Sequence, residues 1–176
     1  MGIKKHIKPA IDYISNKIRK AEEKLPDTNR HILDIDKSIQ PDNYSCGAQS
    51  TFAILKYYGK ARSISNVEKM LGTTKDGTSE TRIYKLFRQR GLKVILNEKA
   101  NFKTIKESII KYKAPFLTTI DYDEDPEKDK SHWIVIYGFS DNYIYVLDPA
   151  IKRPFVRWKK KKFRDRWDKD GAIIYK

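Results

Sequence analysis

The chain has 176 residues, of which 39% are hydrophobic and 12% aromatic, and its formal net charge is +14. This length predicts one domain with a sizeable core, and the hydrophobic content excludes a disordered chain. One cysteine and three histidines exclude a disulfide scaffold and argue against a zinc site. The longest mostly apolar run, residues 133–139, is too short to span a bilayer.

Residues 1–30 combine a basic charge with an apolar stripe. They carry eight basic and four acidic residues, and apolar side chains recur every three or four positions from Ile7 to Leu25. This spacing predicts an amphipathic helix that ends at Pro26. We expect this basic helical extension to dock on the core, and the alternative is a helix that binds a partner or a membrane surface.

Four helices are predicted in the middle of the chain. The first, residues 46–58, is apolar nearly all round, as a buried helix is. The second begins with Ser65-Asn-Val-Glu68, which has the pattern of a capping box. The other two follow from apolar residues at helical spacing. The four helices end close to a glycine or proline, at Gly59, Gly72, Gly91 and Pro115.

Strand patterns dominate the rest of the chain. The predicted strands are residues 92–96, 116–122, 132–139, 143–147, 155–158 and 172–175. Residues 140–142 form a turn that joins two of them into a hairpin, and Phe163 and Trp167 share one face of a short helix. Helices first and antiparallel strands later indicate an α+β fold rather than a parallel α/β sheet.

Cys46 is the candidate nucleophile. It lies where a loop becomes a helix, and the positive end of a helix favours a thiolate. The neighbouring Gly47 allows close approach of backbone or substrate. The alternative is an inert buried cysteine, which is a common state for this residue.

Three further residues complete a catalytic set. His132 begins a predicted strand, and a hairpin centred near Ser140 places it opposite Asp148 to within about one residue. Asp148 would then orient the imidazole. Gln40, six residues before Cys46, is able to donate a hydrogen bond to an oxyanion beside the Cys46 backbone N–H. Each residue alone has an ordinary structural interpretation, but together they supply nucleophile, base, orienting carboxylate and oxyanion donor.

These residues and their surroundings resemble the papain-like bacteriocin-processing cysteine peptidases, cysteine-peptidase family thirty-nine, over roughly residues 36–175. Gln40 with Cys46-Gly47 resembles the family's glutamine and nucleophile motif. Residues 132–138 resemble its histidine strand, and residues 143–150 its aspartate strand. The best-known members cut leader peptides after a double glycine.

The resemblance implies a papain-like fold over residues 31–176, with N-terminal helices packed on a C-terminal antiparallel sheet. It implies a thiol protease or amidase that acts on a peptide or protein substrate through Cys46, His132, Asp148 and Gln40, and that needs no metal or organic cofactor. The first residues lack the apolar region of a secretory signal, so we expect a cytoplasmic protein.

Two other functions are considered. One is a catalytically silent peptide- or protein-binding domain of the same fold. The other is peripheral contact with an anionic surface through the basic ends, since residues 152–169 carry ten basic against two acidic residues. No nucleic-acid-binding motif is present, so a nucleic-acid partner is not expected. The acidic residues 121–129 do not fit an EF-hand loop, and we expect them to form a solvated loop that could favour basic substrates.

Overall fold

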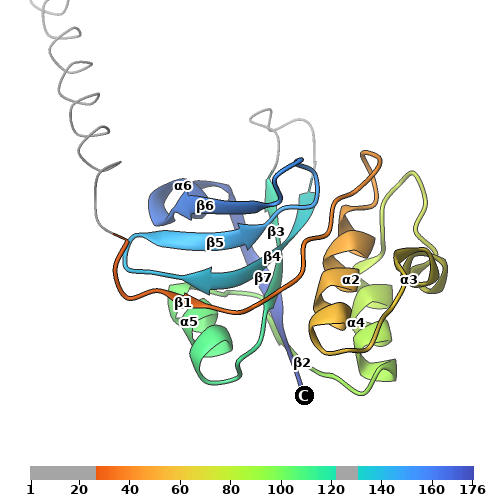
Figure 1. Ribbon diagram of the computed structural model, residues 1–176, viewed down its shortest axis with the longest axis horizontal. Helices are drawn as coiled ribbons and strands as arrows, with labels where there is room; N and C mark the ends of the chain where they lie inside the picture. The colour runs from red at the N-terminus through yellow and green to blue at the C-terminus, as the bar shows by residue number, and fades with distance from the viewer. Residues whose placement is uncertain (1–26, 122–130) are drawn as a thin grey trace, which may run out of the picture.

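The computed structural model describes residues 27–121 and 131–176. The basic N-terminal helix and most of the acidic segment therefore lie outside the described residues. The described part folds into one antiparallel sheet with helices on both of its faces (Figure 1). No helix in that part is long and apolar enough to cross a lipid bilayer.

The elements have the following bounds. The helices are α2 (Cys46–Tyr57), α3 (Ile64–Leu71), α4 (Glu80–Gln89), α5 (Phe102–Ile110) and α6 (Lys160–Arg166). The strands are β1 (His31–Ile32), β2 (Lys93–Asn97), β3 (Phe116–Asp121), β4 (Ser131–Phe139), β5 (Tyr143–Leu147), β6 (Phe155–Lys159) and β7 (Trp167–Tyr175). The predicted helices and strands are present, mostly with small shifts at their ends. The last strand begins at Trp167 and not at residue 172, so the prediction that Phe163 and Trp167 share one face of a short helix is wrong: Phe163 lies in α6 and Trp167 begins β7.

The start of α3 differs from its prediction. Its N-cap is Ser63, and no side-chain capping hydrogen bond is present. The Ser63 hydroxyl instead lies 3.0 Å from the hydroxyl of Ser65. The capping box predicted at Ser65 is therefore wrong, because the helix already begins at Ile64.

The strands lie in the order β2-β7-β3-β4-β5-β6, and β1 pairs with β4. β3 pairs with β4 as far as Ile136, and β1 then pairs with Gly138 and Phe139. A Cβ atom on Gly138 would lie 2.6 Å from the carbonyl oxygen of His31, so the absence of a side chain lets β1 approach closely. The α+β prediction is confirmed.

Side chains alternate between two cores on the two faces of the sheet. Val135 and Tyr137 of β4 join the core under α2, α3 and α4, whereas Ile134 and Ile136 join the core under α5 and α6. Phe163 and Trp167 belong to the second core, and Phe163 is fully buried. These aromatic side chains fill the interior and do not form a stacking surface for nucleic-acid bases.

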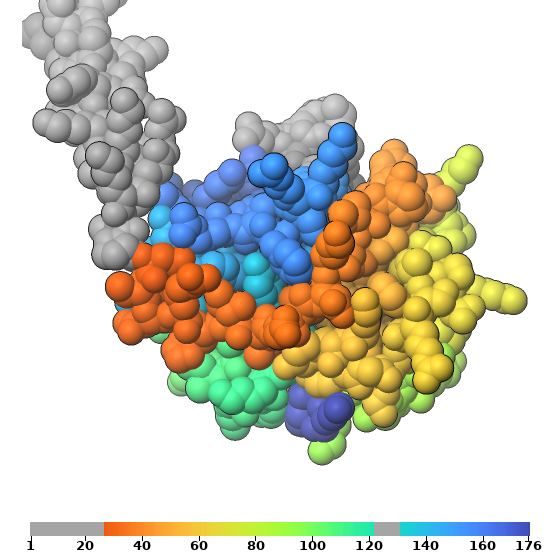
Figure 2. All heavy atoms as spheres, viewed as in Figure 1, coloured from red at the N-terminus to blue at the C-terminus, as the bar shows by residue number. Residues whose placement is uncertain are grey.

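The segment from Asp27 to Ser45 crosses from the sheet to α2 over the front of the molecule (Figure 2). The Asp27 carboxylate accepts hydrogen bonds from Tyr145 and Arg157, which fastens the beginning of this segment to the sheet. Further along, the backbone N–H of Gln40 donates to the carbonyl of Pro149 at 2.8 Å. This contact brings Gln40 next to the chain that follows β5.

Candidate active site

Cys46 is the first residue of α2, and its free thiol is half-buried. A tight turn precedes it, in which Oδ1 of Asp42 accepts the backbone N–H groups of Tyr44 at 2.9 Å and Ser45 at 2.8 Å. The first N–H groups of a helix have no acceptor within the helix, so they concentrate positive charge around the sulfur. The loop and helix therefore present Cys46 in a setting that stabilises a thiolate.

His132 lies at the beginning of β4, where its ring forms a buried pair with Asp148. Nε2 of His132 is 2.7 Å from Oδ1 of Asp148, and the two residues are 7% and 2% exposed. The Asp148 carboxylate also accepts a hydrogen bond from the backbone N–H of Ala150 at 3.0 Å. The backbone N–H of Asp148 donates to the carbonyl of Pro154 at 2.8 Å. These bonds hold the carboxylate, which in turn holds the orientation of the imidazole.

Cys46 and His132 line the same cavity, and the interaction between the thiol and the imidazole shifts the pKa of both groups. Nε2 faces Asp148, so Nδ1 is the ring nitrogen left for the sulfur. Burial acts to raise the pKa of Cys46, but His132 and the N–H groups of Trp133 and Gly47 outweigh burial and lower it. Burial likewise acts to lower the pKa of His132, but Asp148 and Cys46 outweigh it and raise this pKa to about 9. Both shifts favour a thiolate–imidazolium pair.

Gln40 lies in the same cavity as Cys46 and His132, which has a volume of about 550 Å³. Its side-chain amide donates to the Asp42 carbonyl at 2.6 Å, which leaves its second N–H for another acceptor. Its Oε1 atom is buried and accepts no hydrogen bond from the described residues. The amide is thus held at the edge of the cavity by the same turn that precedes Cys46.

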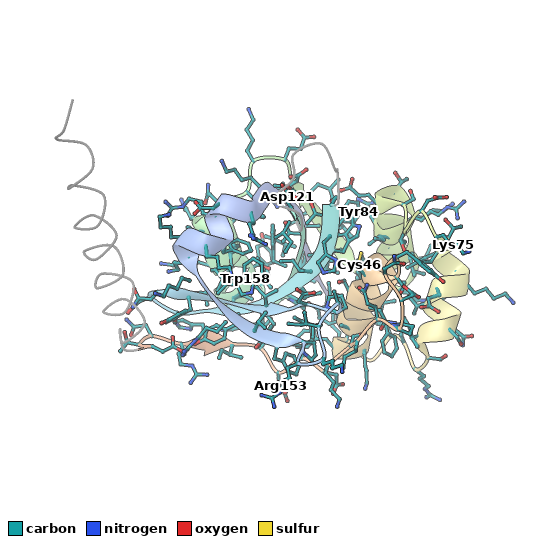
Figure 3. The ribbon with its side chains drawn as sticks, turned by 90° about the horizontal axis from the view of Figure 1, so that it is seen from above. Cys46, Lys75, Tyr84, Asp121, Arg153 and Trp158 are labelled. Atoms are coloured by element: carbon teal, nitrogen blue, oxygen red, sulfur yellow. The ribbon has the colours of Figure 1, made fainter. Side chains whose placement is uncertain are left out.

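The structure brings Cys46, His132, Asp148 and Gln40 together from four separate segments, between the helical layer and the sheet. Figure 3 shows Cys46 at this junction. The predicted register of the hairpin is wrong by two residues, however. Val135 pairs with Leu147, so the ladder continued past this pair places Ile134, not His132, opposite Asp148.

One positioning residue was missed by the sequence analysis. Asp42 accepts two backbone N–H groups and provides the carbonyl that holds Gln40. Its signal was present, because Asp in a run of turn-forming residues often binds the N–H groups two and three residues ahead. Among the described residues, no group of three or more metal-binding side chains is close enough to hold a metal ion.

Comparison with known proteins identifies the family of this constellation. The family model described as Peptidase C39 family matches residues 35–175. The lactococcin-G-processing and transport ATP-binding protein LagD of Lactococcus lactis is 30% identical over 136 residues, which are 77% of this chain and 18% of that protein. The lactococcin transport/processing ATP-binding protein LcnC-like of the same species is 28% identical over 129 residues, 73% of this chain and 17% of that protein. The chain thus spans less than a fifth of the length of these curated relatives.

Solved structures show the same fold. A double glycine motif protease from an AMS/PCAT transporter, solved with its leader peptide, has a TM-score of 0.65 and 22% identity over 83% of this chain and 94% of its own. The peptidase domain of Streptococcus ComA, a bi-functional ABC transporter, has a TM-score of 0.67 and 22% identity over 82% of this chain and 98% of its own. The family match covers most of the chain, and the chain belongs to the Peptidase C39 family of cysteine peptidases.

Proposed function

We propose that the chain hydrolyses a peptide bond with Cys46 as nucleophile, His132 as acid and base, Asp148 as the orienting carboxylate and Gln40 as an oxyanion donor. The observation that carries the proposal is the position of His132, which hydrogen-bonds Asp148 at 2.7 Å and lines the same cavity as Cys46, with whose thiol it interacts. This arrangement has the order of a catalytic triad: nucleophile, base and a third group that orients the base.

The proposed reaction has two stages. The Cys46 thiolate attacks the carbonyl carbon, and the resulting oxyanion accepts hydrogen bonds from the Cys46 backbone N–H and the free N–H of Gln40. His132 then gives its Nδ1 proton to the leaving amine, and the C–N bond breaks to leave a thioester. In the second stage His132 takes a proton from water, and the resulting hydroxide attacks the carbonyl carbon of the thioester. The C–S bond then breaks, which releases the carboxylic acid product and restores the Cys46 thiolate.

The substrate class follows from the relatives. Lactococcin-processing transporters and a double glycine motif protease are similar to this chain. We therefore expect a peptide substrate cut after two small residues, of which glycine is the first candidate.

Residues 1–30 are proposed as an extension beside the peptidase domain, in a protein of the cytoplasm. The basic extension and the basic residues 152–169 would then contact an anionic surface.

The proposal is tested with a library of peptides that is digested by the protein and read by mass spectrometry, with Cys46→Ala as the blank. We expect cleavage that depends on Cys46 and that is enriched after Gly-Gly, Gly-Ala or Gly-Ser. Cleavage that persists in Cys46→Ala would contradict the proposal.

A second measurement separates a peptidase from a silent binding domain of the same fold. Iodoacetamide alkylates thiolates, so an activated Cys46 should react faster at pH 7 in the wild type than in His132→Ala. A silent domain with an ordinary thiol would react equally slowly in both proteins and would cut no peptide.

A further inference from the structure

A second cavity of about 620 Å³ adjoins the proposed catalytic cleft. Ser131 lines both cavities, and Trp133 of the second cavity directly follows His132 in the chain. Its wall contains four carboxylates and no lysine, arginine or histidine among the described residues. The carboxylates belong to Glu80, Asp121, Asp168 and Asp170. We call this space the acidic cavity.

The fold brings these acids together from three elements. Glu80 lies in the first turn of α4, and Asp121 is the last residue of β3. Asp168 and Asp170 lie in an irregular stretch of β7, where the register with β3 shifts between Thr118 and Ile120. A bulge of this kind redirects side chains out of the regular alternation of a strand.

Hydrogen bonds hold this irregular stretch of β7 in place. Lys169 has a φ of 65°, in the left-handed region, and its carbonyl accepts the N–H of Ala100 at 2.6 Å. The carbonyl of Asp170 accepts the hydroxyl of Thr118, which itself accepts the indole N–H of Trp167 at 2.8 Å. These contacts use backbone atoms or neighbouring side chains, and none of them involves the carboxylate of Asp168 or Asp170.

The acidic cavity is lined by negative charges, although the chain as a whole is positively charged. The net charge of the chain is +14, yet no described lysine or arginine forms an ion pair with Glu80, Asp168 or Asp170. Burial, together with the charges of Asp168, Glu80 and Glu98, raises the pKa of Asp170. A cation entering the acidic cavity would relieve this repulsion.

The geometry of the described residues favours an organic cation in the acidic cavity. No three metal-binding side chains of the described residues converge on one point, although the cavity holds four carboxylates. The side chains of Tyr84 and Trp133 add aromatic surface to the wall. Such a wall suits the apolar stem of a lysine or arginine whose charged end reaches the carboxylates. Figure 3 shows Tyr84, on the helical layer, and Asp121, on the sheet, toward the side of Cys46 that faces away from Arg153.

We propose that the acidic cavity is a substrate subsite that receives a lysine or arginine side chain of the peptide cleaved at Cys46. The inference rests on the proposed peptidase function and extends it, because it adds a charged determinant within a few residues of the scissile bond. The peptide backbone would cross the catalytic cleft, and the basic side chain would pass Ser131 into the neighbouring cavity.

The first test is cleavage of matched peptides that carry lysine, ε-acetyl-lysine or alanine at each position near the cut bond. We expect lysine at one fixed position to give a kcat/KM about tenfold or more above that of acetyl-lysine, mainly through KM. The double variant Asp168→Asn/Asp170→Asn should remove this difference by lowering kcat/KM for the lysine peptide to the value for the acetyl-lysine peptide. A lysine preference that is absent, or that survives in the double variant, would overturn the inference.

The control is Asp36→Asn/Asp165→Asn, which changes the net charge equally at exposed acids outside both cavities. It should keep the lysine preference. Equal loss in the control would show that the effect is only the net charge of the protein, and would also overturn the inference.

The second test needs no catalysis. Anisotropy of a fluorescein-labelled tetralysine peptide and of its fully acetylated counterpart is measured with Cys46→Ala, alone and combined with Asp168→Asn/Asp170→Asn. Tighter binding of tetralysine that disappears with the aspartates supports the subsite, even if no peptide is cut and the proposed function fails. Equal binding of the two peptides would overturn the subsite even if Cys46-dependent cleavage is found.

Discussion

Nε2 of His132 lies 2.7 Å from Oδ1 of Asp148, although the hairpin places the two residues diagonally rather than directly opposite each other. Near the turn Gly138 pairs with Tyr145, and after an irregularity Ile136 pairs with Val146. Continued without this bulge, the first register would put Asp148 and His132 on opposite faces of the sheet. The bulge shifts the pairing by one residue, so both side chains share a face at an offset that long side chains span.

Asp148 is expected to matter through charge and through orientation. Asp148→Asn keeps an acceptor for the Nε2 proton but removes the charge, and we expect kcat/KM to fall about 10- to 100-fold. Asp148→Ala removes both the acceptor and the charge, so kcat/KM should fall further. The loss should lie within the range of about 10²–10⁴-fold that a positioned acid or base contributes. Because Asp148 raises the pKa of His132, the alkaline limit of activity should move to lower pH in both variants. Urea unfolding serves as the control for folding, and full activity of Asp148→Ala would mean that another group orients His132.

The pH dependence of the Cys46 thiol follows from the two opposite shifts. The pKa of Cys46 lies below its ordinary value of 9.0, and that of His132 is raised to about 9, so the ion pair exists between the two values. Alkylation by iodoacetamide should therefore reach half of its maximal rate below pH 9 in the wild type. In His132→Ala the midpoint should move upward, because the burial that raises the thiol pKa remains without the counter-charge. Peptidase activity should decline above about pH 9, where His132 loses its proton. A midpoint unchanged in His132→Ala would show that the imidazole does not stabilise the thiolate.

The helices and strands were predictable because their signals are local. The run from Ile134 to Phe139 and the glycine after the helix that begins at Cys46 each mark an element from neighbouring residues alone. The diagonal pairing of His132 with Asp148 was not predictable, since nothing in the sequence marks the bulge beside Gly138 except the glycine itself.

In the candidate site, too, some residues were predictable from the sequence and others were not. Gln40, Cys46, His132 and Asp148 were proposed from motifs, whose spacing is written in the chain. The acidic cavity was missed because Glu80 and Asp170 come from segments that meet only through tertiary packing and a bulged strand. The predicted helix before Pro26 and most of the acidic segment 121–129 lie outside the described residues, so both stay predictions.

Gln40 is expected to act in the transition state. Gln40→Ala removes a side-chain donor to the oxyanion, and loss of such a donor typically lowers kcat about 10²–10³-fold. KM should change little, since the oxyanion forms only after substrate has bound. Steady-state kinetics separate the two constants. A large rise in KM with kcat unchanged would instead assign Gln40 to substrate binding.

Asp42 is expected to position Cys46 and Gln40 through hydrogen bonds and not through its charge. Asp42→Asn retains the Oδ1 acceptor for the N–H groups of Tyr44 and Ser45, so it should keep most of the kcat. Asp42→Ala leaves these groups without an acceptor and should cost about 1–2 kcal/mol of stability as well as activity. Both variants are compared by urea unfolding and by kcat on one peptide. Equal damage in the two variants would mean that the negative charge itself is required.

Gly47 is expected to be intolerant of even one added methyl group. A Cβ atom there would lie 2.9 Å from Cβ of Thr78 and 3.1 Å from Cδ1 of Trp133, both of which line the acidic cavity. Replacement of glycine by alanine in an open helix usually stabilises it by about 1 kcal/mol. Here overpacking should reverse the sign, so that Gly47→Ala destabilises the protein by about 1–3 kcal/mol in urea unfolding.

The source of the Gly47 effect is tested by a double-mutant cycle. Thr78→Gly removes the nearest atom, so Gly47→Ala should cost less in that background than in the wild type, and the two changes should not add. Peptidase activity should fall in Gly47→Ala beyond the loss of folded protein, because displaced Thr78 and Trp133 would alter the wall beside Cys46 and His132. Strictly additive free energies of unfolding would show that contact with Thr78 does not cause the destabilisation. If Gly47→Ala is more stable than the wild type, the added methyl group has no packing cost in this helix.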